Sequence, residues 1–360
     1  MQLRIPGPTP CPPEVLEAMG KQMINHRGGQ FAEMLRRVTE KMKTLFQTKN
    51  DLYILTGSGT GSLEAAVVNM LSPGDKVLSA SNGVFGNRFA DIAEAYSADV
   101  TRLKFEWGKP VDPEVVHKAL KADSKIKAVL LTHNETSTDV TSDLKEIAAI
   151  INEFDKLIIV DAISSMGCID LKVDAWKCDV VVTGSQKGWM VPPGLAMVSV
   201  SERGWKAHAQ AKMPRFYWDF TKCKSYFEKG QTPWTPAISI MYALDVSLDM
   251  MLKEGLNNIL TRHAKIGDMT RKGVKSLGLS LFPADERYAS NTVTAVNGSE
   301  KVSAPKLQQI LREEYKVVVS GGQGDLTGKI FRIGHLGWVT EADIKETLDA
   351  ISKALPKANA

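Results

Sequence analysis

Short apolar runs alternate with amphipathic segments over the first two-thirds of the chain. The runs are nearly continuous and rich in β-branched residues, which is typical of parallel strands covered by helices on both faces. The segments between them carry apolar residues at helical spacing, as Leu63, Val67 and Met70 do. The sequence therefore predicts an α/β fold with an open, mostly parallel sheet. The strands are expected at Leu52–Leu55, Lys76–Ala80, Val100–Leu103, Ile126–Thr132, Leu157–Asp161, Asp179–Thr183 and Leu195–Val200.

The two ends of the chain have different patterns. The first thirteen residues contain five prolines and one glycine, so we expect an extended arm there. Helical patterns follow at Pro13–Asn25 and Phe31–Phe46. From about Ser239 one long helical stretch reaches Leu277 and leads into shorter elements, which predict a smaller α+β unit with the long helix as a hinge. Its strands are expected at Asn291–Val296, Val317–Val319 and Lys329–Ile333, and its helices at Ala304–Tyr315 and Glu341–Leu355.

Composition and charge narrow the class of protein. A length of 360 residues suggests two or three domains. The 45 basic and 41 acidic residues give a net charge of +4 that is spread along the chain, which argues against nucleic-acid binding. The amino terminus has no apolar signal segment and no run is long enough to span a membrane. Four cysteines without a Cys-x-x-Cys pair fit reduced thiols, so we expect a cytoplasmic location and no metal site.

A glycine-rich loop, Gly57–Ser62, follows an expected strand and opens an expected helix. Its amide groups and the helix dipole suit a phosphate. A Walker A loop is excluded because no lysine follows before Lys76. A dinucleotide fingerprint is excluded because Ser62 stands at its last position and no acid ends the next strand. A turn with a helix cap is the alternative interpretation.

Asp161 ends one expected strand, and Lys187 comes just after the next one in the chain. A carboxylate at the carboxyl end of a buried parallel strand lies where open α/β sheets bind ligands, and the alternative is a capping aspartate. Lys187 lies among small residues and has room to react, although most lysines are solvated. Together with the glycine-rich loop, a lysine for a Schiff base and an aspartate for a pyridinium nitrogen predict a pyridoxal 5′-phosphate site.

Motifs along nearly the whole chain resemble the class V, fold type I aminotransferases, close to the alanine–glyoxylate and serine–glyoxylate or serine–pyruvate group. The most specific are Ser185-Gln-Lys187 and Arg332-Ile-Gly-His-Leu-Gly337. The resemblance implies a large cofactor domain with a mostly parallel mixed sheet and a smaller α+β domain. With the change of pattern it divides the chain into an arm at 1–13, a large domain at 14–254 and a small domain at 255–360.

The resemblance implies a role for each matching residue. Lys187 would bind the cofactor covalently and move the substrate α-proton, and Asp161 would keep the pyridine nitrogen protonated. Arg332 would bind the substrate α-carboxylate as a bidentate partner. Phe85 would stack on the ring, and Thr136 would bond near the ring hydroxyl.

The phosphate and the substrate side chain would contact further residues. The phosphate would be held by Ser58, Gly59, Thr60 and Gln186, with Thr235 reaching it from a partner subunit. Thr232 departs from the pattern, because the nearest relatives often have a phosphate-binding tyrosine there. Gly7, in Pro6-Gly-Pro-Thr9, would line the small end of the pocket, a wall that favours alanine, serine or glycine-sized side chains.

Several of these residues also have a purely structural interpretation. His133 is more often a satisfied histidine beside a site than an acid–base group. In its structural interpretation Phe85 is an aromatic residue of the core. Thr136 is, in the same way, a turn residue whose hydroxyl closes a local backbone hydrogen bond. Thr235 would be an extended linker residue before a proline, and Arg332 a partner in a structural ion pair.

The expected activity is transfer of an amino group from a small amino acid, alanine or serine, to glyoxylate or pyruvate by a ping-pong mechanism. A homodimer is expected because the family builds each site at the interface, and the arm would then lie on the partner. A cysteine desulfurase or lyase on the same fold is a competing hypothesis, but no cysteine follows Cys223 and Phe85 occupies the stacking position. A cofactor-binding subunit of a larger complex is a further one.

Overall fold

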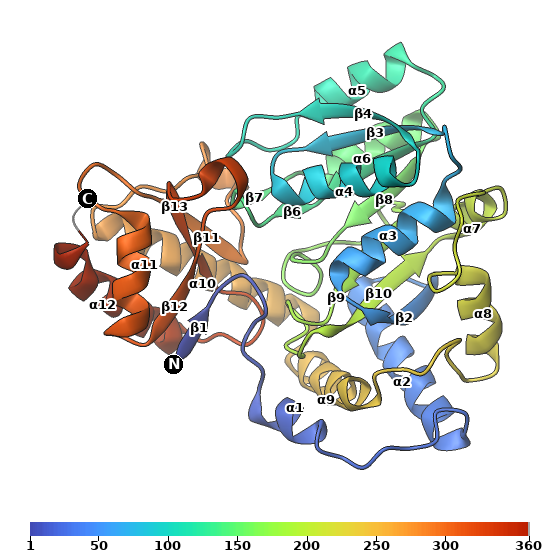
Figure 1. Ribbon diagram of the computed structural model, residues 1–360, viewed down its shortest axis with the longest axis horizontal. Coiled ribbons are helices and arrows are strands. Elements are labelled where there is room, and N and C mark those ends of the chain that lie inside the picture. Colours follow the sequence, from blue (N-terminus) through green and yellow to red (C-terminus); the bar gives the residue numbers. More distant parts are fainter. Residues whose placement is uncertain (359–360) are drawn as a thin grey trace.

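The computed structural model describes residues 1–358 and contains two main sheets, each with its own helices (Figure 1). The larger sheet has seven strands in the order β2-β10-β9-β8-β5-β3-β4, and only β10 runs against its neighbours. The predicted α/β fold with a mostly parallel sheet is therefore confirmed, and all seven predicted strands form. Their bounds are β2 Asp51–Gly57, β3 Lys76–Ser81, β4 Asp99–Lys104, β5 Ala128–Thr132, β8 Leu157–Asp161, β9 Val180–Gly184 and β10 Gly194–Val200.

Helices cover both faces of the large sheet, which explains why its central strands are apolar throughout. One apolar core joins the sheet to α1 Pro13–Ala18, α2 Gly29–Phe46, α5 Pro113–Ala122, α6 Leu144–Glu153 and α9 Ile238–Glu254. The other joins it to α3 Gly59–Met70, α4 Val84–Ala95, α7 Glu202–His208 and α8 Phe220–Glu228. Along β8, Ile158 and Val160 enter the first core while Leu157 and Ile159 enter the second, so successive side chains point to opposite faces.

The second sheet has four strands in the order β1-β12-β13-β11 and a separate apolar core. Its strands are β1 Gln2–Arg4, β11 Val293–Asn297, β12 Val317–Gly321 and β13 Ile330–Gly334. It is accompanied by α10 Leu256–Ser276, α11 Ala304–Glu313 and α12 Glu341–Ala354. A short hairpin of β6 Asn134–Glu135 and β7 Val140–Thr141, with 3-10 turns at Glu286–Tyr288, Gly324–Leu326 and Leu355–Lys357, completes the elements.

The structure corrects three boundaries. The helix predicted at Pro13–Asn25 ends at Ala18, shortly before Gly20. The long helix predicted from Ser239 to Leu277 is two helices, because Gly255 adopts a φ of +82° that ends α9 and starts α10 in a new direction. The amino-terminal arm is not wholly irregular, since Gln2–Arg4 pairs in parallel with β12 of its own chain and does not extend away from it.

Within residues 1–358, no helix combines the length and the apolarity needed to cross a membrane.

Candidate active site

A cavity of about 240 Å³ lies where β8 and β9 end and α3 begins. This is the carboxyl edge of the parallel strands, the place where open α/β sheets bind ligands. Nine of the residues singled out in the sequence line it: Gly7, Ser58, Gly59, Thr60, Phe85, Thr136, Asp161, Gln186 and Lys187. Segments more than a hundred residues apart in sequence therefore meet in one cavity.

Lys187 projects into the cavity from the loop after β9. Its Nζ donates a hydrogen bond to the backbone oxygen of Pro6 at 2.7 Å. Burial lowers the pKa of this amine to about 8, and the positive charges of Arg332 and Arg88 act in the same direction, while Asp161 opposes them. About a tenth of the amine is therefore neutral, and so nucleophilic, at pH 7, far more than for an ordinary lysine.

Asp161 is the last residue of β8 and is buried. Its Oδ1 accepts a hydrogen bond from the backbone N–H of Ile163 at 2.9 Å. Burial raises the pKa of this carboxyl to about 7, partly countered by the Ile163 N–H and by Lys187. A cation beside Asp161 would favour its ionised form, which is the environment that a protonated pyridine nitrogen offers.

The glycine-rich loop forms the opposite wall of the cavity. Ser58 caps α3 by accepting the N–H of Gly61, and Gly59 packs so tightly that a Cβ there would lie 2.7 Å from Cδ1 of Ile163. The exposed amide groups and the dipole at the start of α3 suit an anion. Gln186 lines the same cavity with a buried Oε1 that has no hydrogen-bond partner among the described residues. If this amide rotates, its NH₂ group faces the cavity instead of the oxygen. The NH₂ group can then donate a hydrogen bond to a phosphate oxygen.

Phe85 lies in the first turn of α4, and Glu135 fixes where that turn begins. The buried Glu135 carboxylate accepts the N–H groups of Phe85 and Gly86, both at 3.0 Å. Burial raises the pKa of Glu135, while its hydrogen bonds to Ser137 and to these amides lower it. Glu135 was not singled out in the sequence, because its contact with α4 exists only in the folded chain.

Arg332 and Thr235 do not line the cavity as the other predicted residues do. Arg332, on β13, donates from Nε to the backbone oxygen of Gly321 and from Nη1 to that of Thr136, both at 2.9 Å. The Thr136 bond joins the small sheet to the cavity wall. Thr235 is exposed in the segment before α9, and Thr232 donates its hydroxyl to the oxygen of Trp234 within the same loop.

Arg88 also lines the cavity and was missed in the sequence. It follows Phe85 by three residues on α4, a spacing that places two side chains on the same helix face and was a usable signal. His133 lies outside the cavity, edge-on to Trp176, and its Nδ1 has no partner among residues 1–358. Burial lowers the pKa of His133 to about 4, so it is neutral at physiological pH.

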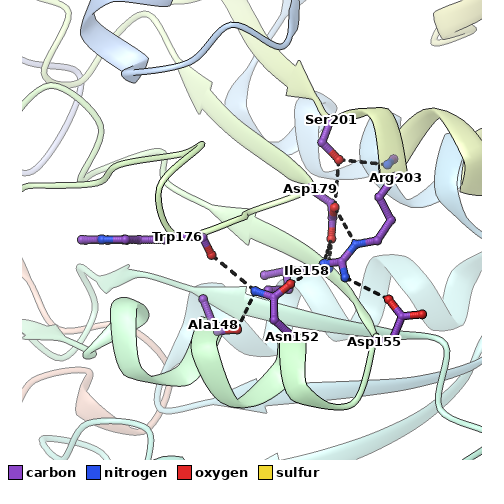
Figure 2. Close-up of polar contacts among 9 residues, drawn as sticks. Ala148, Asn152, Asp155, Ile158, Trp176, Asp179, Ser201 and Arg203 are labelled. Carbon is purple, nitrogen blue, oxygen red and sulfur yellow. Dashed lines mark hydrogen bonds and ion pairs between the residues drawn. The ribbon is translucent and has the colours of Figure 1, made fainter.

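A larger cavity, of about 530 Å³, lies at the opposite edge of the sheet, where β8 and β9 begin. There Asp179 accepts hydrogen bonds from Ser201, Arg203 and the N–H of Ile158, as Figure 2 shows. Arg203 also bonds Asn152 and Asp155. These groups satisfy one another, so the network stabilises the ends of the strands and offers no free group for chemistry. Over residues 1–358, no group of three or more His, Cys, Asp or Glu side chains is placed to hold a metal ion.

Comparison with known proteins agrees with the geometry of the carboxyl-edge cavity. The profile of the family described as aminotransferase class-V matches residues 3–332. The chain belongs to the class V aminotransferases. Membership in this family implies pyridoxal 5′-phosphate as the cofactor, and it makes the protein a transaminase by family.

Relatives in this family carry different names. The chain is 44% identical to the soluble hydrogenase 42 kDa subunit of Anabaena cylindrica, over 99% of this chain and 93% of that protein. It is 37% identical to L-aspartate–glyoxylate aminotransferase of Paracoccus denitrificans, over 94% of this chain and 87% of that protein. Among solved structures, pyridoxamine-pyruvate aminotransferase of Mesorhizobium loti matches with a TM-score of 0.96 at 31% identity, covering 99% of this aminotransferase and 92% of that chain.

Proposed function

We propose that this class V aminotransferase moves the amino group of a small amino acid, alanine or serine, to a 2-oxo acid such as glyoxylate or pyruvate. The two half-reactions would share one site in a ping-pong cycle. The observation that carries the proposal is the pair formed by Lys187, with a pKa of about 8, and the buried Asp161 in one cavity.

Pyridoxal 5′-phosphate fits the donors of this cavity. Ser58, Gly59, Thr60 and Gln186 would hold its phosphate at the start of α3, and Asp161 its pyridine nitrogen. Phe85 would lie against its ring, and Thr136 near its hydroxyl. When bound, the cofactor supplies an electron sink for the carbanion formed at the substrate α-carbon.

Lys187 would act first as the group that binds the cofactor and then as a base. Its low pKa leaves Nζ able to accept a proton from the substrate α-carbon and to return it at the other end of the reacting system. The Nζ of Lys187 donates a hydrogen bond to the backbone oxygen of Pro6 at 2.7 Å. Asp161 would carry the negative charge that keeps the ring nitrogen protonated.

Arg332 would bind the α-carboxylate of the amino acid and of the 2-oxo acid. Burial lowers the pKa of its guanidinium to about 10, yet it remains charged at neutral pH. Gly7 supports the preference for small side chains, because it lies directly against Lys187. Glyoxylate and pyruvate as acceptors are supported by the names of two relatives, whereas the aspartate in one of these names is a competing donor.

A homodimer is part of this proposal. Thr235 is exposed and lies outside the cavity of its own chain, so it could reach a phosphate only in a second subunit. Sedimentation of the full chain should therefore give about twice 39.4 kDa. A monomer at micromolar concentration would remove Thr235 from the site.

Two other functions compete with amino transfer as explanations of this site. A cysteine desulfurase needs a mobile cysteine near the small sheet, but no cysteine follows Cys223, which is itself buried. A cofactor-binding subunit of a larger complex is favoured by the names of two relatives, the soluble hydrogenase subunits of Anabaena cylindrica and of Synechococcus. Such a subunit would bind the cofactor without converting an amino acid.

The test is a half-reaction panel read from the visible and near-ultraviolet absorbance of the bound cofactor. Alanine, serine, glutamate, aspartate and 2-aminoethylphosphonate are each added to the loaded enzyme, with Lys187→Ala as the control. Alanine or serine should convert the cofactor fastest, and the Lys187→Ala protein should lack the original band. Comparable rates with alanine and glutamate would refute the small-substrate claim, and no conversion by any donor would refute amino transfer.

A further inference from the structure

Arg88, on α4, is a cation of the cavity wall to which the proposed function gives no role. Its Nη1 lies 3.5 Å from the Thr60 hydroxyl oxygen, and its guanidinium lies 4.8 Å from the centre of the Phe85 ring. No Asp or Glu of the described part of the chain forms an ion pair with it, although many other arginines have such partners. The guanidinium is therefore held in place by contacts that leave its charge free.

The proposed phosphate ligands lack a positive charge. A phosphate monoester carries about −1.5 to −2 charges at neutral pH, whereas the start of a helix offers only about +0.5. Ser58, Thr60 and Gln186 are neutral donors. Lys187 is assigned to the cofactor's reactive carbon and Arg332 to the substrate carboxylate, so the phosphate end of the cavity has no assigned counter-charge.

We propose that Arg88 supplies this counter-charge by binding the cofactor phosphate beside Thr60, an inference that rests on the proposed function. A planar guanidinium suits the task because it donates to two phosphate oxygens at once. Its position also fits, because Thr60 belongs to the first turn of α3, where the amide groups converge.

Two features of α4 hold Arg88 in this position. Glu135 bonds the N–H groups of Phe85 and Gly86 and so fixes the start of the helix. Phe85, three residues before Arg88, lies under the guanidinium. One short segment of helix would then serve both the ring and the phosphate of the cofactor.

A competing role for Arg88 is to bind a second acidic group on a dicarboxylic substrate. The contacts favour the phosphate, because Arg88 touches the loop at Thr60, while Arg332 bonds the carbonyls of Gly321 and Thr136. The two roles differ in which ligand loses affinity when the charge is removed.

The experiment compares pyridoxal 5′-phosphate with pyridoxal, which lacks the phosphate, as ligands of the full-length apoenzyme. Dissociation constants are measured by equilibrium dialysis for the wild type, Arg88→Gln, Arg88→Lys and the control Arg312→Gln. Arg312 is an exposed arginine on α11, far from the cavity lining, so its substitution makes the same chemical change elsewhere.

In Arg88→Gln, the dissociation constant for pyridoxal 5′-phosphate should rise by about 10- to 100-fold, the value of one or two charge-assisted bonds. That for pyridoxal should change by less than about twofold, as should both constants in Arg312→Gln. Arg88→Lys keeps the positive charge but lacks the planar guanidinium, so it should recover part of the affinity. Melting temperatures within about 3 °C of the wild type would exclude loss of fold as the cause.

The inference is overturned if Arg88→Gln weakens both ligands equally, or if it leaves cofactor affinity unchanged and raises only the KM for aspartate. Either result requires that the wild type bind the cofactor, so it leaves the proposed function intact. If the wild type binds no pyridoxal 5′-phosphate, the proposed function itself is wrong.

Discussion

Gly7 offers a direct test of how the cavity is built around Lys187. It has a φ of +146°, a conformation that side-chain-bearing residues rarely adopt. A Cβ added there would lie 2.6 Å from Nζ of Lys187, 2.8 Å from its Cε and 2.9 Å from its Cδ. The substitution Gly7→Ala therefore strains the backbone and displaces the lysine at the same time.

The size of each effect follows from these distances. A residue held in such a backbone region costs about 1–3 kcal/mol, so the free energy of unfolding should fall by that amount. Since non-bonded heavy atoms prefer a separation of about 3.5–4.0 Å, the amine must move by roughly 1 Å. A displacement of that size at a reacting group can cost about 100-fold in rate, and we expect kcat/KM with alanine to fall accordingly.

The assay separates the two effects with a matched control. Gly74 also has a positive φ, of +78°, but a Cβ there would meet nothing within 4 Å. Gly74→Ala should therefore lose about 1 kcal/mol in urea unfolding and keep the wild-type half-reaction rate. Gly7→Ala should lose both stability and rate. Wild-type kcat/KM in Gly7→Ala, or an equal loss in the two variants, would refute the placement of Gly7 against the reactive amine.

Three further predictions follow from the pKa values and contacts of single residues. Because only a neutral amine attacks the cofactor and burial lowers the pKa of Lys187, the loading rate followed by absorbance should rise with pH around about 8, and a midpoint near 10.5 would contradict this. Asp161→Asn keeps an acceptor for the Ile163 N–H but removes the charge, so the alanine half-reaction should slow by about 100-fold or more while the melting temperature stays constant. Burial lowers the pKa of His263 from 6.5 to about 3, so the folded chain resists a proton that the unfolded chain binds. Stability should therefore fall as the pH drops below 6.5, by about 2 kcal/mol at pH 5 from this residue. Urea unfolding of His263→Gln should show a smaller loss of stability between pH 7 and pH 5 than the wild type does. An equal loss in the two proteins would contradict the prediction.

The elements that could be predicted from the sequence are those whose pattern is set locally. The strand at Leu157–Asp161 is buried on both faces, so all five residues belong to an apolar run with a polar end, and it is found without error. The helix break at Gly255 was not predicted, because a single glycine inside a helical pattern can be tolerated without ending the helix. Strand β1 was not predicted, because three residues are too few to show the alternation of a strand. Its partner residues, Val317–Val319, lie almost the whole chain away in sequence.

In the candidate site, too, the residues that could be predicted are those marked by a local sequence pattern. Lys187 and Asp161 could be predicted because Asp161 ends a recognisable strand and Lys187 follows another, and the carboxyl ends of neighbouring parallel strands meet. The roles of Arg88 and Glu135 were harder to predict, because Arg88 on α4 contacts Thr60 on α3, and Glu135 on β6 bonds the N–H of Phe85 on α4. Charged residues are common on helices, and only the folded chain shows which of them faces a cavity.

The two sheets divide the proposed work between them. The residues proposed for the cofactor, such as Ser58 and Asp161, follow or end strands of the large sheet. The residues proposed for the substrate come from the small sheet, since Arg332 lies on β13 and Gly7 follows β1. Gly334 packs so closely on the backbone of Ile5 and Pro6 that a Cβ there would lie 2.2 Å from the Ile5 carbonyl, so the arm and β13 are fixed to each other. A change of substrate is therefore expected from substitutions near the arm and β13, whereas substitutions on α3 or α4 should change cofactor affinity.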